Sequence, residues 1–438
     1  MTQTIHVLGG GLAGLVTAYY ARRHGREVSV YEAAPDVGGN ARTLRFEDVL
    51  VDTGAHRLHD KSPVATEAFR DLLGPSMRKV EATSEIRYQG KGIAFPLRPL
   101  NAARQLGPAT FLRVACEVMQ HSLRPRREPT TFQDLALSRY GPTLAEALLL
   151  GYSEKLWGVP TSRLAPSVAG GRLRGLTLGT MLRELISGRS AAAHLDGAFY
   201  YPTRGFGMLA DALVEAVGPE RIQTRAIVTR IRHEGGRIRA IEVNGGLPRP
   251  VGEVMSTLPL PRFVGLLDPA PPGAVLEAAS TLRYRHVRLA ILRLNVSRVS
   301  PHASLYVPDP DVPFTRIYEP KNRSWEMAPG DKTAVVVEVP CSDWDAWWTL
   351  SDDAFVEALL PDVRRVIHGA MGEVLSMHSV RLSNAYPVLD VGHQATVDTL
   401  QEYASGFDNL ALAGRAGTFR YLHTHDLFSE AAEWAKRH

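Results

Sequence analysis

The sequence predicts an α/β fold that is built around a discontinuous Rossmann-like domain. Three observations predict it: a glycine-rich turn between an apolar run and an amphipathic segment at the N-terminus, a second strand pattern near the C-terminus that returns to the same sheet, and an intervening region that is first helical and then strand-rich. The expected parts are a nucleotide-binding domain at 1–80, 200–280 and 384–438, a mainly helical insert at 100–195, and an antiparallel β-sheet substrate domain at 81–99 and 281–383.

Length and charge restrict the classes of function. The chain has 438 residues, which favours two or three domains, and a formal net charge of +4. Its tight basic run is "RPRR" at Arg124–Arg127, and a nucleic-acid-binding protein usually concentrates its charge more than this. We expect a small-molecule partner, and an anionic one fits the charge.

The two cysteines, Cys116 and Cys341, lie far apart and show no metal-ligand spacing, so we expect neither a disulfide framework nor a metal site. The pair His423 and His425 has no evident third ligand. No apolar run is long enough for a membrane span, and no signal peptide precedes the first expected strand. These features predict a cytoplasmic protein.

The first thirty-odd residues carry a dinucleotide-binding pattern. The run "IHVLGGGLAGLVTAYYARRHGREVSVYEA" is typical of a strand, a tight turn, a helix and a second strand. Gly9 permits the turn, Gly11 lets the backbone approach a pyrophosphate, and Gly14 lets helix and strand pack closely. Glu32 ends the second strand, where a carboxylate can accept hydrogen bonds from a ribose diol.

The following residues point to FAD as the cofactor. Gly38 and Gly39, followed by Arg42, resemble the second FAD fingerprint of the glutathione-reductase-like and amine-oxidase-like flavoproteins. A second G-x-G-x-x-G, which would hold a nicotinamide dinucleotide, is absent from the sequence. Near the C-terminus a predicted strand ends in Gly414 and Arg415, and in the FAD family such a strand closes the flavin site.

A predicted hairpin joins the same domain. The stretch from Arg221 to Gly246 alternates as two strands around an "EGG" turn, and Val228 in its first strand is a further expected cofactor contact. The segment "EVMSTLP" then predicts a strand that returns to the nucleotide-binding sheet.

The inserted material changes pattern along the chain. The segments "FQDLALSRYGPTLAEALLL" and "LTLGTMLRELI" carry apolar residues at helical intervals. Further on, "VRLAILRLNV" and "TAVVVEVP" favour strands, and Asp352–Gly372 favours a helix. A sheet domain over the flavin is the expected arrangement.

Four further segments resemble one family, the UDP-galactopyranose mutases. Their counterparts there are G-Y-T-E-K-Q-W-G, P-(F/Y/W)-T-R-I-x-E-x-K, G-R-x-G-T-Y-R-Y-x-D-M-D and G-x-H-x-x-H. In this chain they read "LLGYSEKLWGVP" at Leu149–Pro160, "PFTRIYEPKN" at Pro313–Asn322, "AGRAGTFRYLHTHD" at Ala413–Asp426 and "GAHRLH" at Gly54–His59. The resemblance spans nearly the whole chain, and the surrounding pattern is also similar to protoporphyrinogen-oxidase-like and amine-oxidase-like flavoproteins.

The resemblance implies a reaction. In the mutases N5 of the reduced flavin attacks the anomeric carbon of a nucleotide sugar, and two arginines hold the diphosphate that leaves. There is no net redox change, so an external electron donor is needed to reduce the flavin. A guanidinium fork in a water-poor site stabilises such a leaving group well.

By this resemblance Arg316 is one diphosphate-binding arginine and Arg172 is the other, with Arg174 an alternative to Arg172. Tyr421 corresponds to a tyrosine that donates to the diphosphate. The resemblance places His56 and Arg415 close to the isoalloxazine, and Tyr152 and Trp157 at the mouth of the site, where an aromatic ring can face a nucleobase or sugar.

Other interpretations stay open because the sequence departs from the family around the sugar pocket. Leu156 replaces the glutamine of K-Q-W-G, and the tail around His423 is one residue longer. An oxidase or desaturase that passes hydride from substrate to FAD and then to oxygen is the main alternative, and a non-catalytic flavin-binding scaffold is another. Arg316 could also be a plain strand residue that pairs with Glu319.

Overall fold

The computed structural model describes residues 4–95, 105–122, 128–169 and 198–438. Arg172, its alternative Arg174 and the segment "LTLGTMLRELI" lie outside the described residues.

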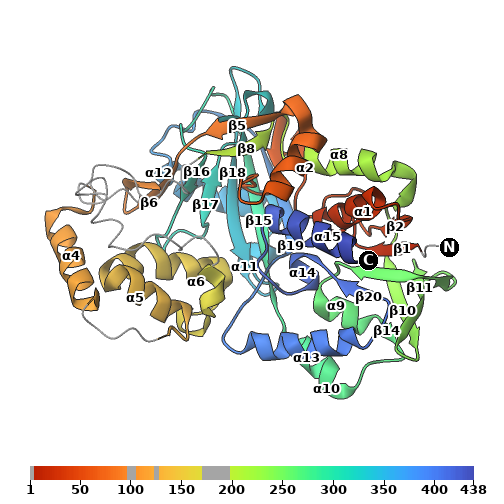
Figure 1. The fold of residues 1–438 in the computed structure, drawn as a ribbon. Coiled ribbons are helices and arrows are strands. Elements are labelled where there is room, and N and C mark those ends of the chain that lie inside the picture. The colour runs from red at the N-terminus through yellow and green to blue at the C-terminus, as the bar shows by residue number, and fades with distance from the viewer. Residues whose placement is uncertain (1–3, 96–104, 123–127, 170–197) are drawn as a thin grey trace.

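A five-stranded parallel sheet forms the centre of the nucleotide-binding part (Figure 1). Its strands, in spatial order, are β20 (Leu410–Leu412), β13 (Glu253–Ser256), β1 (Ile5–Leu8), β2 (Val28–Tyr31) and β9 (Ile222–Gln223). Ile5 pairs with both Val28 and Glu253. The strands come from three distant parts of the chain, as the predicted discontinuous Rossmann-like arrangement requires.

The alternation of side chains along β1 assigns the two faces of this sheet. Ile5 and Val7 point into a core shared with the helices α1 (Leu12–Arg23), α2 (Pro63–Leu73), α8 (Gly207–Val217) and α15 (Thr424–Arg437).

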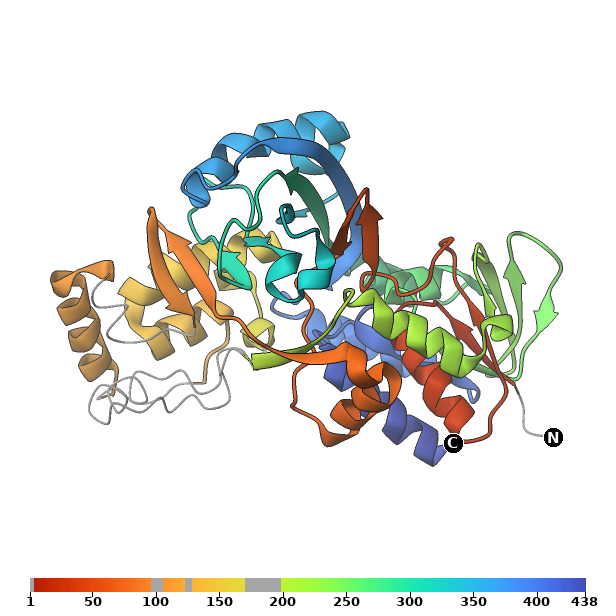
Figure 2. The ribbon, with the colours of Figure 1, turned by 90° about the horizontal axis from the view of Figure 1, so that it is seen from above.

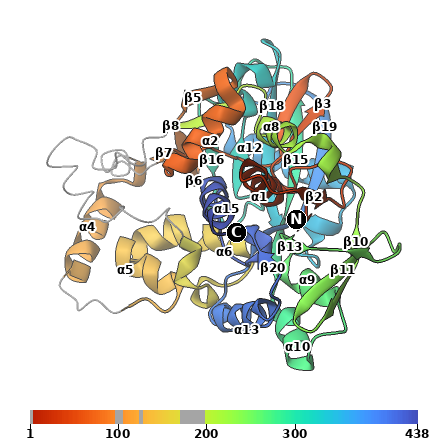
Figure 3. The same cartoon turned by 45° about the vertical axis from the view of Figure 1, so that its right-hand side comes forward.

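Leu8 belongs to the core on the opposite face. That core includes the hairpin of β10 (Val228–Glu234) and β11 (Arg237–Val243), with α9 (Leu260–Gly265), α10 (Gly273–Thr281) and α13 (His393–Ser405) (Figure 3). The hairpin predicted around "EGG" is therefore present, and the strands β12 (Arg249–Pro250) and β14 (Leu267–Asp268) extend it to four strands.

A seven-stranded sheet forms the second layer. In spatial order it contains β19 (Val374–Pro387), β15 (Tyr284–Leu294), β18 (Thr333–Cys341), β17 (Arg316–Tyr318), β16 (Ser304–Tyr306), β6 (Ser84–Tyr88) and β7 (Lys91–Phe95). The sheet is antiparallel, as predicted, with one parallel pair, β16 and β6. The parallel pair arises because β6 enters the sheet from the N-terminal part of the chain.

The two faces of this sheet have different covers. Val335 and Val337 point to the face that α12 (Asp352–Val366) and α11 (Ala346–Thr349) pack near, and α12 lies along the outside of the sheet in Figure 2. Ala334 and Val336 point to the other face, where they meet Val49 and Val51. Those two valines belong to the hairpin of β3 (Thr43–Phe46) and β4 (Val49–Asp52).

The helical region lies at one end of the molecule (Figure 1). It contains α4 (Pro108–Ser122), α5 (Phe132–Ala145) and α6 (Gly151–Trp157), with one π-helical turn at Glu146–Leu150 between the last two. Gly141 has a φ of 72° and kinks α5 just before Pro142. Elsewhere β5 (Met77–Glu81) pairs with β8 (Ala198–Pro202). In the ranges that the structure describes, we find no helix with the length and apolarity that a membrane crossing requires.

Candidate cofactor and substrate site

The glycine turn after β1 is so crowded that only glycine fits at two of its positions. Gly9 has a φ of +108°, and a Cβ on it would lie 2.3 Å from Oγ1 of Thr257. A Cβ on Gly14 would lie 1.9 Å from the carbonyl oxygen of Gly9. Gly11 differs, because a Cβ there would have nothing closer than Cα of Gly39 at 3.9 Å. The backbone at Gly11 is therefore open to an approaching ligand, as a pyrophosphate site requires.

The two glycine motifs lie side by side. The amide of Gly38 donates to the carbonyl of Gly10 at 2.8 Å, and Gly11 and Gly38 form a parallel bridge. The helix α1 starts at this point with Gly11 as its N-cap and no side-chain cap. Its first amides and the positive end of its dipole are thus available to a phosphate.

Glu32 lies next to the turn and organises it. Its Oε2 accepts from the amide of Gly10 and its Oε1 accepts from the amide of Ala34, both at 2.7 Å. Its carbonyl accepts from the amide of Ala226 at 2.8 Å, which sets the start of β10 and the buried Val228 beside it. Each carboxylate oxygen keeps a second lone pair for a ribose hydroxyl.

A four-residue helix, α14 (Gly414–Gly417), closes the site from the C-terminal side. A Cβ on Gly414 would lie 2.5 Å from Cβ of Ala13, so α14 packs directly against the start of α1. The Arg415 guanidinium donates to the carbonyls of Leu422 and Ala385 at 2.6 and 3.0 Å. Arg415 therefore fixes the chain on either side of the site.

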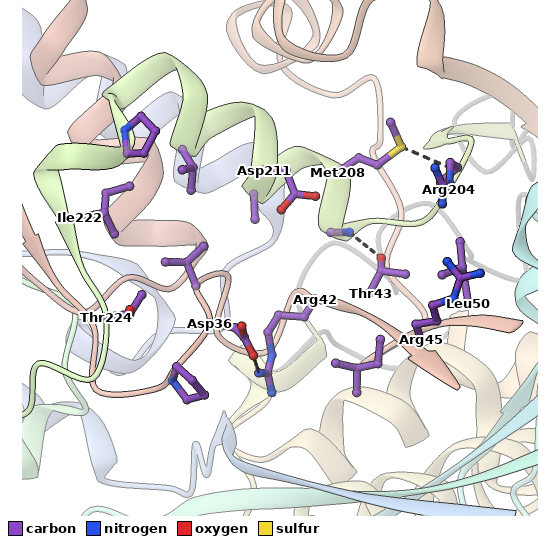
Figure 4. A pocket seen from close by; sticks show the side chains of 17 residues that line it. Asp36, Arg42, Thr43, Arg45, Leu50, Arg204, Met208, Asp211, Ile222 and Thr224 are labelled. Carbon is purple, nitrogen blue, oxygen red and sulfur yellow. Dashed lines mark hydrogen bonds and ion pairs between the residues drawn. The ribbon is translucent and has the colours of Figure 1, made fainter. Parts of the chain in front are cut away.

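The crowded glycines, the open backbone at Gly11 and the uncapped helix fit a dinucleotide cofactor. Arg42 lies beside the second glycine motif, since a Cβ on Gly38 would lie 3.1 Å from Cγ of Arg42, and its contact with the cofactor stays a prediction. Its guanidinium lies 3.9 Å from Asp36 and lines a surface cavity of about 810 Å³ (Figure 4). None of Gly9, Gly11 or Gly14 lines that cavity.

Arg316 forms an ion pair across two strands. Its Nε donates to Oε2 of Glu338 at 2.8 Å, because the register of β17 and β18 places the two residues opposite each other. The other carboxylate oxygen of Glu338 accepts from the amide of Ala55 at 3.1 Å. Burial by itself lowers the pKa of Arg316, but Glu338 and the nearby tyrosines raise it well above its usual value. Arg316 is therefore a permanent cation in a half-buried position, and its partner is Glu338 instead of Glu319.

Glu319 has a different task. Its carboxylate is buried and accepts from the amides of Val299 and Ser300 and from Oγ1 of Thr333. It therefore organises the loop before β16 and takes no part in the site.

Aromatic rings surround the Arg316–Glu338 pair on two sides. Trp157 contacts Tyr386 and Tyr421, with ring centroids 5.8 and 5.5 Å apart, and Arg415 lies 5.0 Å from the Tyr421 ring. On the other side Tyr306 lies 6.1 Å from the Tyr152 ring and 5.9 Å from the Arg316 guanidinium. Burial raises the pKa of Tyr386, so its hydroxyl keeps its proton and can donate.

His56 is a neutral imidazole in this site. Its Nε2 lies 2.9 Å from the carbonyl oxygen of Asn40, so Nε2 carries the proton and Nδ1 is free to accept. Burial, together with the nearby charges of Arg323, Arg415 and Arg316, lowers the pKa of His56 to about 3. The ring packs on Phe206 at 4.8 Å.

The structure thus brings together His56, Arg316, Arg415 and the predicted aromatic residues. Sequence reasoning missed Glu338, Tyr386, Tyr306 and Lys155. A signal existed for Glu338: in "TAVVVEVP" it is the charged residue in a run of β-branched residues, and period-two alternation places it on the same face as Val336. Tyr386, in contrast, lies near the end of the long strand β19, and nothing in its local sequence marks it.

Comparisons with known proteins find similarity to flavoproteins. The model of a family described as flavin-containing amine oxidoreductase matches residues 12–426. Coproporphyrinogen III oxidase of Bacillus subtilis (strain 168) is 20% identical over 437 residues, which cover 93% of this chain and 92% of that protein. A Klebsiella pneumoniae protein described as a probable UDP-galactopyranose mutase is 27% identical over 174 residues, which cover 38% of this chain and 44% of that protein.

The fold comparison gives a similar answer. The crystal structure of reduced UDP-galactopyranose mutase superimposes with a TM-score of 0.86 at 18% identity, covering 100% of this chain and 95% of that chain. At this identity the match establishes the fold alone, and it confirms the fold class predicted above.

Proposed function

The chain belongs to the flavin-containing amine oxidoreductase family and is an FAD-dependent flavoenzyme, and on that premise we propose that it acts on a nucleotide sugar in a pyranose–furanose mutase reaction. FAD, when bound and reduced, would supply a nucleophilic nitrogen for the anomeric carbon. An external donor must first reduce it.

The observation that carries this proposal is the environment of Arg316. Two of its nitrogens, Nε and Nη2, are bound by Glu338. Among the described residues Nη1 has no hydrogen-bond acceptor, and the Arg316 side chain keeps 13% of its surface exposed. A guanidinium that is held from one side and open on the other suits a diphosphate oxygen. An oxidase pocket would more often be apolar with a single orienting polar group.

The other side chains would have distinct tasks. Glu338 would keep Arg316 in one rotamer through its link to the amide of Ala55. Trp157 would offer a ring to the base or sugar, and the hydroxyls of Tyr386 and Tyr421 would donate to the diphosphate. The neutral His56 would accept a hydrogen bond near the flavin without adding a charge. Arg172 would add a second cation if it reaches the same site.

The direct test is turnover. The protein is reduced anaerobically, mixed with UDP- and dTDP-hexoses, and the products are separated to detect a furanose. The expected result is interconversion that needs reduced flavin and produces no peroxide. Turnover that needs oxidised flavin and yields hydrogen peroxide would contradict the proposal.

Arg316→Ala tests the proposed binding group. We expect UDP binding to weaken by about a hundredfold or more, because a charge-assisted pair is lost, while the FAD absorbance stays. The double variant Arg316→Ala with Glu338→Gln is the control, since the single change leaves a buried carboxylate unpaired and can destabilise the fold. Unchanged UDP affinity in both variants would show that Arg316 does not bind diphosphate.

A second candidate is an oxidase or desaturase that transfers hydride to FAD. The relative that favours it, coproporphyrinogen III oxidase, matches 93% of the chain, whereas the mutase relative matches 38%. An exposed edge of Arg316 could equally hold a substrate carboxylate. Repeating the turnover experiment in air with oxidised flavin separates the two, because only this candidate consumes oxygen in proportion to product.

A further inference from the structure

The ammonium of Lys155 is held by backbone carbonyls. Lys155 lies in α6, and its Nζ donates to the carbonyl oxygens of Val307, Asp309, Val312 and Phe314 at 2.7, 2.8, 3.0 and 3.0 Å. A cation surrounded by four carbonyl oxygens is strongly oriented, because each bond is charge-assisted. Burial lowers the pKa of Lys155 to about 8, so the ammonium is the major form at neutral pH.

All four carbonyls belong to one loop, and that loop connects two strands of the site. Residues 307–315 join β16, which ends at Tyr306, to β17, which begins at Arg316. The loop therefore determines how the strand that carries Arg316 leaves the sheet edge. Thr315 adds a backbone link, since its amide donates to the carbonyl of Glu338 at 3.0 Å.

The helix that carries Lys155 also carries two residues of the aromatic wall. Tyr152 and Trp157 lie three positions before and two positions after Lys155. Tyr152 meets Tyr306, and Trp157 meets Tyr386 and Tyr421. In the last turn of α6, the carbonyl oxygen of Lys155 accepts a hydrogen bond from Nη2 of the buried Arg285 at 3.3 Å. Lys155 is thus the side-chain link between α6 and the loop before Arg316.

We propose that Lys155 is a positioning residue that docks the helix α6 onto the strand carrying Arg316. The rings of Tyr152 and Trp157 and the Arg316 guanidinium then face the substrate at a fixed separation. Lys155 acts through Tyr152, Trp157 and Arg316 and does not itself touch the substrate. The docking claim stands on the contacts alone, whereas its consequence for ligand affinity rests on the nucleotide-sugar function proposed above.

A matched control exists in the same chain. The ammonium of Lys321 is also held by carbonyls, those of Pro329, Gly330 and Lys332, at 2.5 to 2.9 Å. None of these partners belongs to the site. Lys155→Met and Lys321→Met therefore remove the same chemistry from two places, one that joins the site walls and one that does not.

The first measurement is hydrogen exchange of the FAD-bound protein. In Lys155→Met we expect amide exchange in 151–157 and 307–315 to accelerate by about tenfold or more, with the nucleotide-binding strands unchanged. Lys321→Met should accelerate exchange only around 329–332. If Lys155→Met leaves 307–315 as protected as in the wild type, the docking role is wrong.

The second measurement is the affinity of each variant for UDP, by calorimetry. Lys155→Met should bind UDP at least about tenfold more weakly, because a displaced Arg316 would lose its charge-assisted contact with the diphosphate, while Lys321→Met stays within about twofold. Equal weakening in both variants, or none in Lys155→Met, would overturn the positioning role. If Lys155→Met shows the expected exchange pattern but the wild type does not bind UDP, the proposed function is refuted and the docking of α6 by Lys155 still holds.

Discussion

At the scale of single residues, burial and neighbouring charges determine the charge states of Arg316 and His56. Arg316 stays cationic beside Glu338, whereas burial lowers the pKa of His56 to about 3. Three arginines near His56 act in the same direction, because each positive charge disfavours an imidazolium. The site therefore has fixed cations and a neutral acceptor throughout the physiological pH range.

The neutral His56 predicts a pH dependence of stability. Its pKa in the folded protein lies below the value of about 6.5 in an unfolded chain, so below pH 6.5 the unfolded state binds a proton that the folded state does not. This contribution is complete above pH 6.5 and is lost as the pH falls toward 3. Between pH 7 and 4.5 the loss is up to ~2.5 kcal/mol.

His56→Gln checks this, because an amide keeps a donor for the Asn40 carbonyl and does not titrate. The free energy of urea unfolding should fall less in the variant than in the wild type when the pH is lowered from 7 to 4.5. Equal losses in the two proteins would mean that His56 is not protected from protonation in the fold.

Among the elements, strand alternation explains what sequence could reveal about the site. Arg316 and Glu338 lie on one face because they stand at paired positions of adjacent strands, and the two core clusters on either side of β18 assign its faces. The rival pairing of Arg316 with Glu319 fails for the same reason, since residues three apart on an extended chain point to opposite faces. Tyr386 could not be found this way, because its place depends on contacts between distant strands.

The start of α1 predicts the effect of a single methyl group. In Gly14→Ala the new Cβ would meet the carbonyl oxygen of Gly9 at 1.9 Å, so helix and strand must separate and the phosphate-binding amides must move. We expect the purified variant to lose most of its bound FAD, as measured by flavin absorbance. Gly265→Ala is the control, because a Cβ there has nothing within 4 Å, and it should retain FAD. A Gly14→Ala protein with a full complement of flavin would contradict this account of the turn.

At the level of the whole molecule, the local patterns predicted the fold class well because several of its strands and turns have a clear sequence pattern. The glycine turn, the hairpin and the β-branched strands can each be predicted from their local sequence. The cofactor contact of Arg42 stays a prediction, because the fingerprint places the glycines but does not fix the direction of a side chain three residues later. The parallel pairing of β6 with β16 likewise depends on a long connection that no local pattern records.

Because the cofactor site is assembled from distant segments, FAD should stabilise the whole chain. The predicted cofactor contacts at the glycine turn, Glu32, Val228 and Gly414 come from separate parts of the sequence. A ligand that binds only the folded state adds about 4 kcal/mol at a concentration a thousand times its Kd. We expect removal of FAD to lower the thermal midpoint by at least about 5 °C, and added FAD to restore it in a concentration-dependent way. ADP should restore only part of the thermal midpoint, because ADP lacks the flavin that would lie toward Arg415 and His56. A midpoint that is the same with and without FAD would show that the fold does not depend on the cofactor to join these segments.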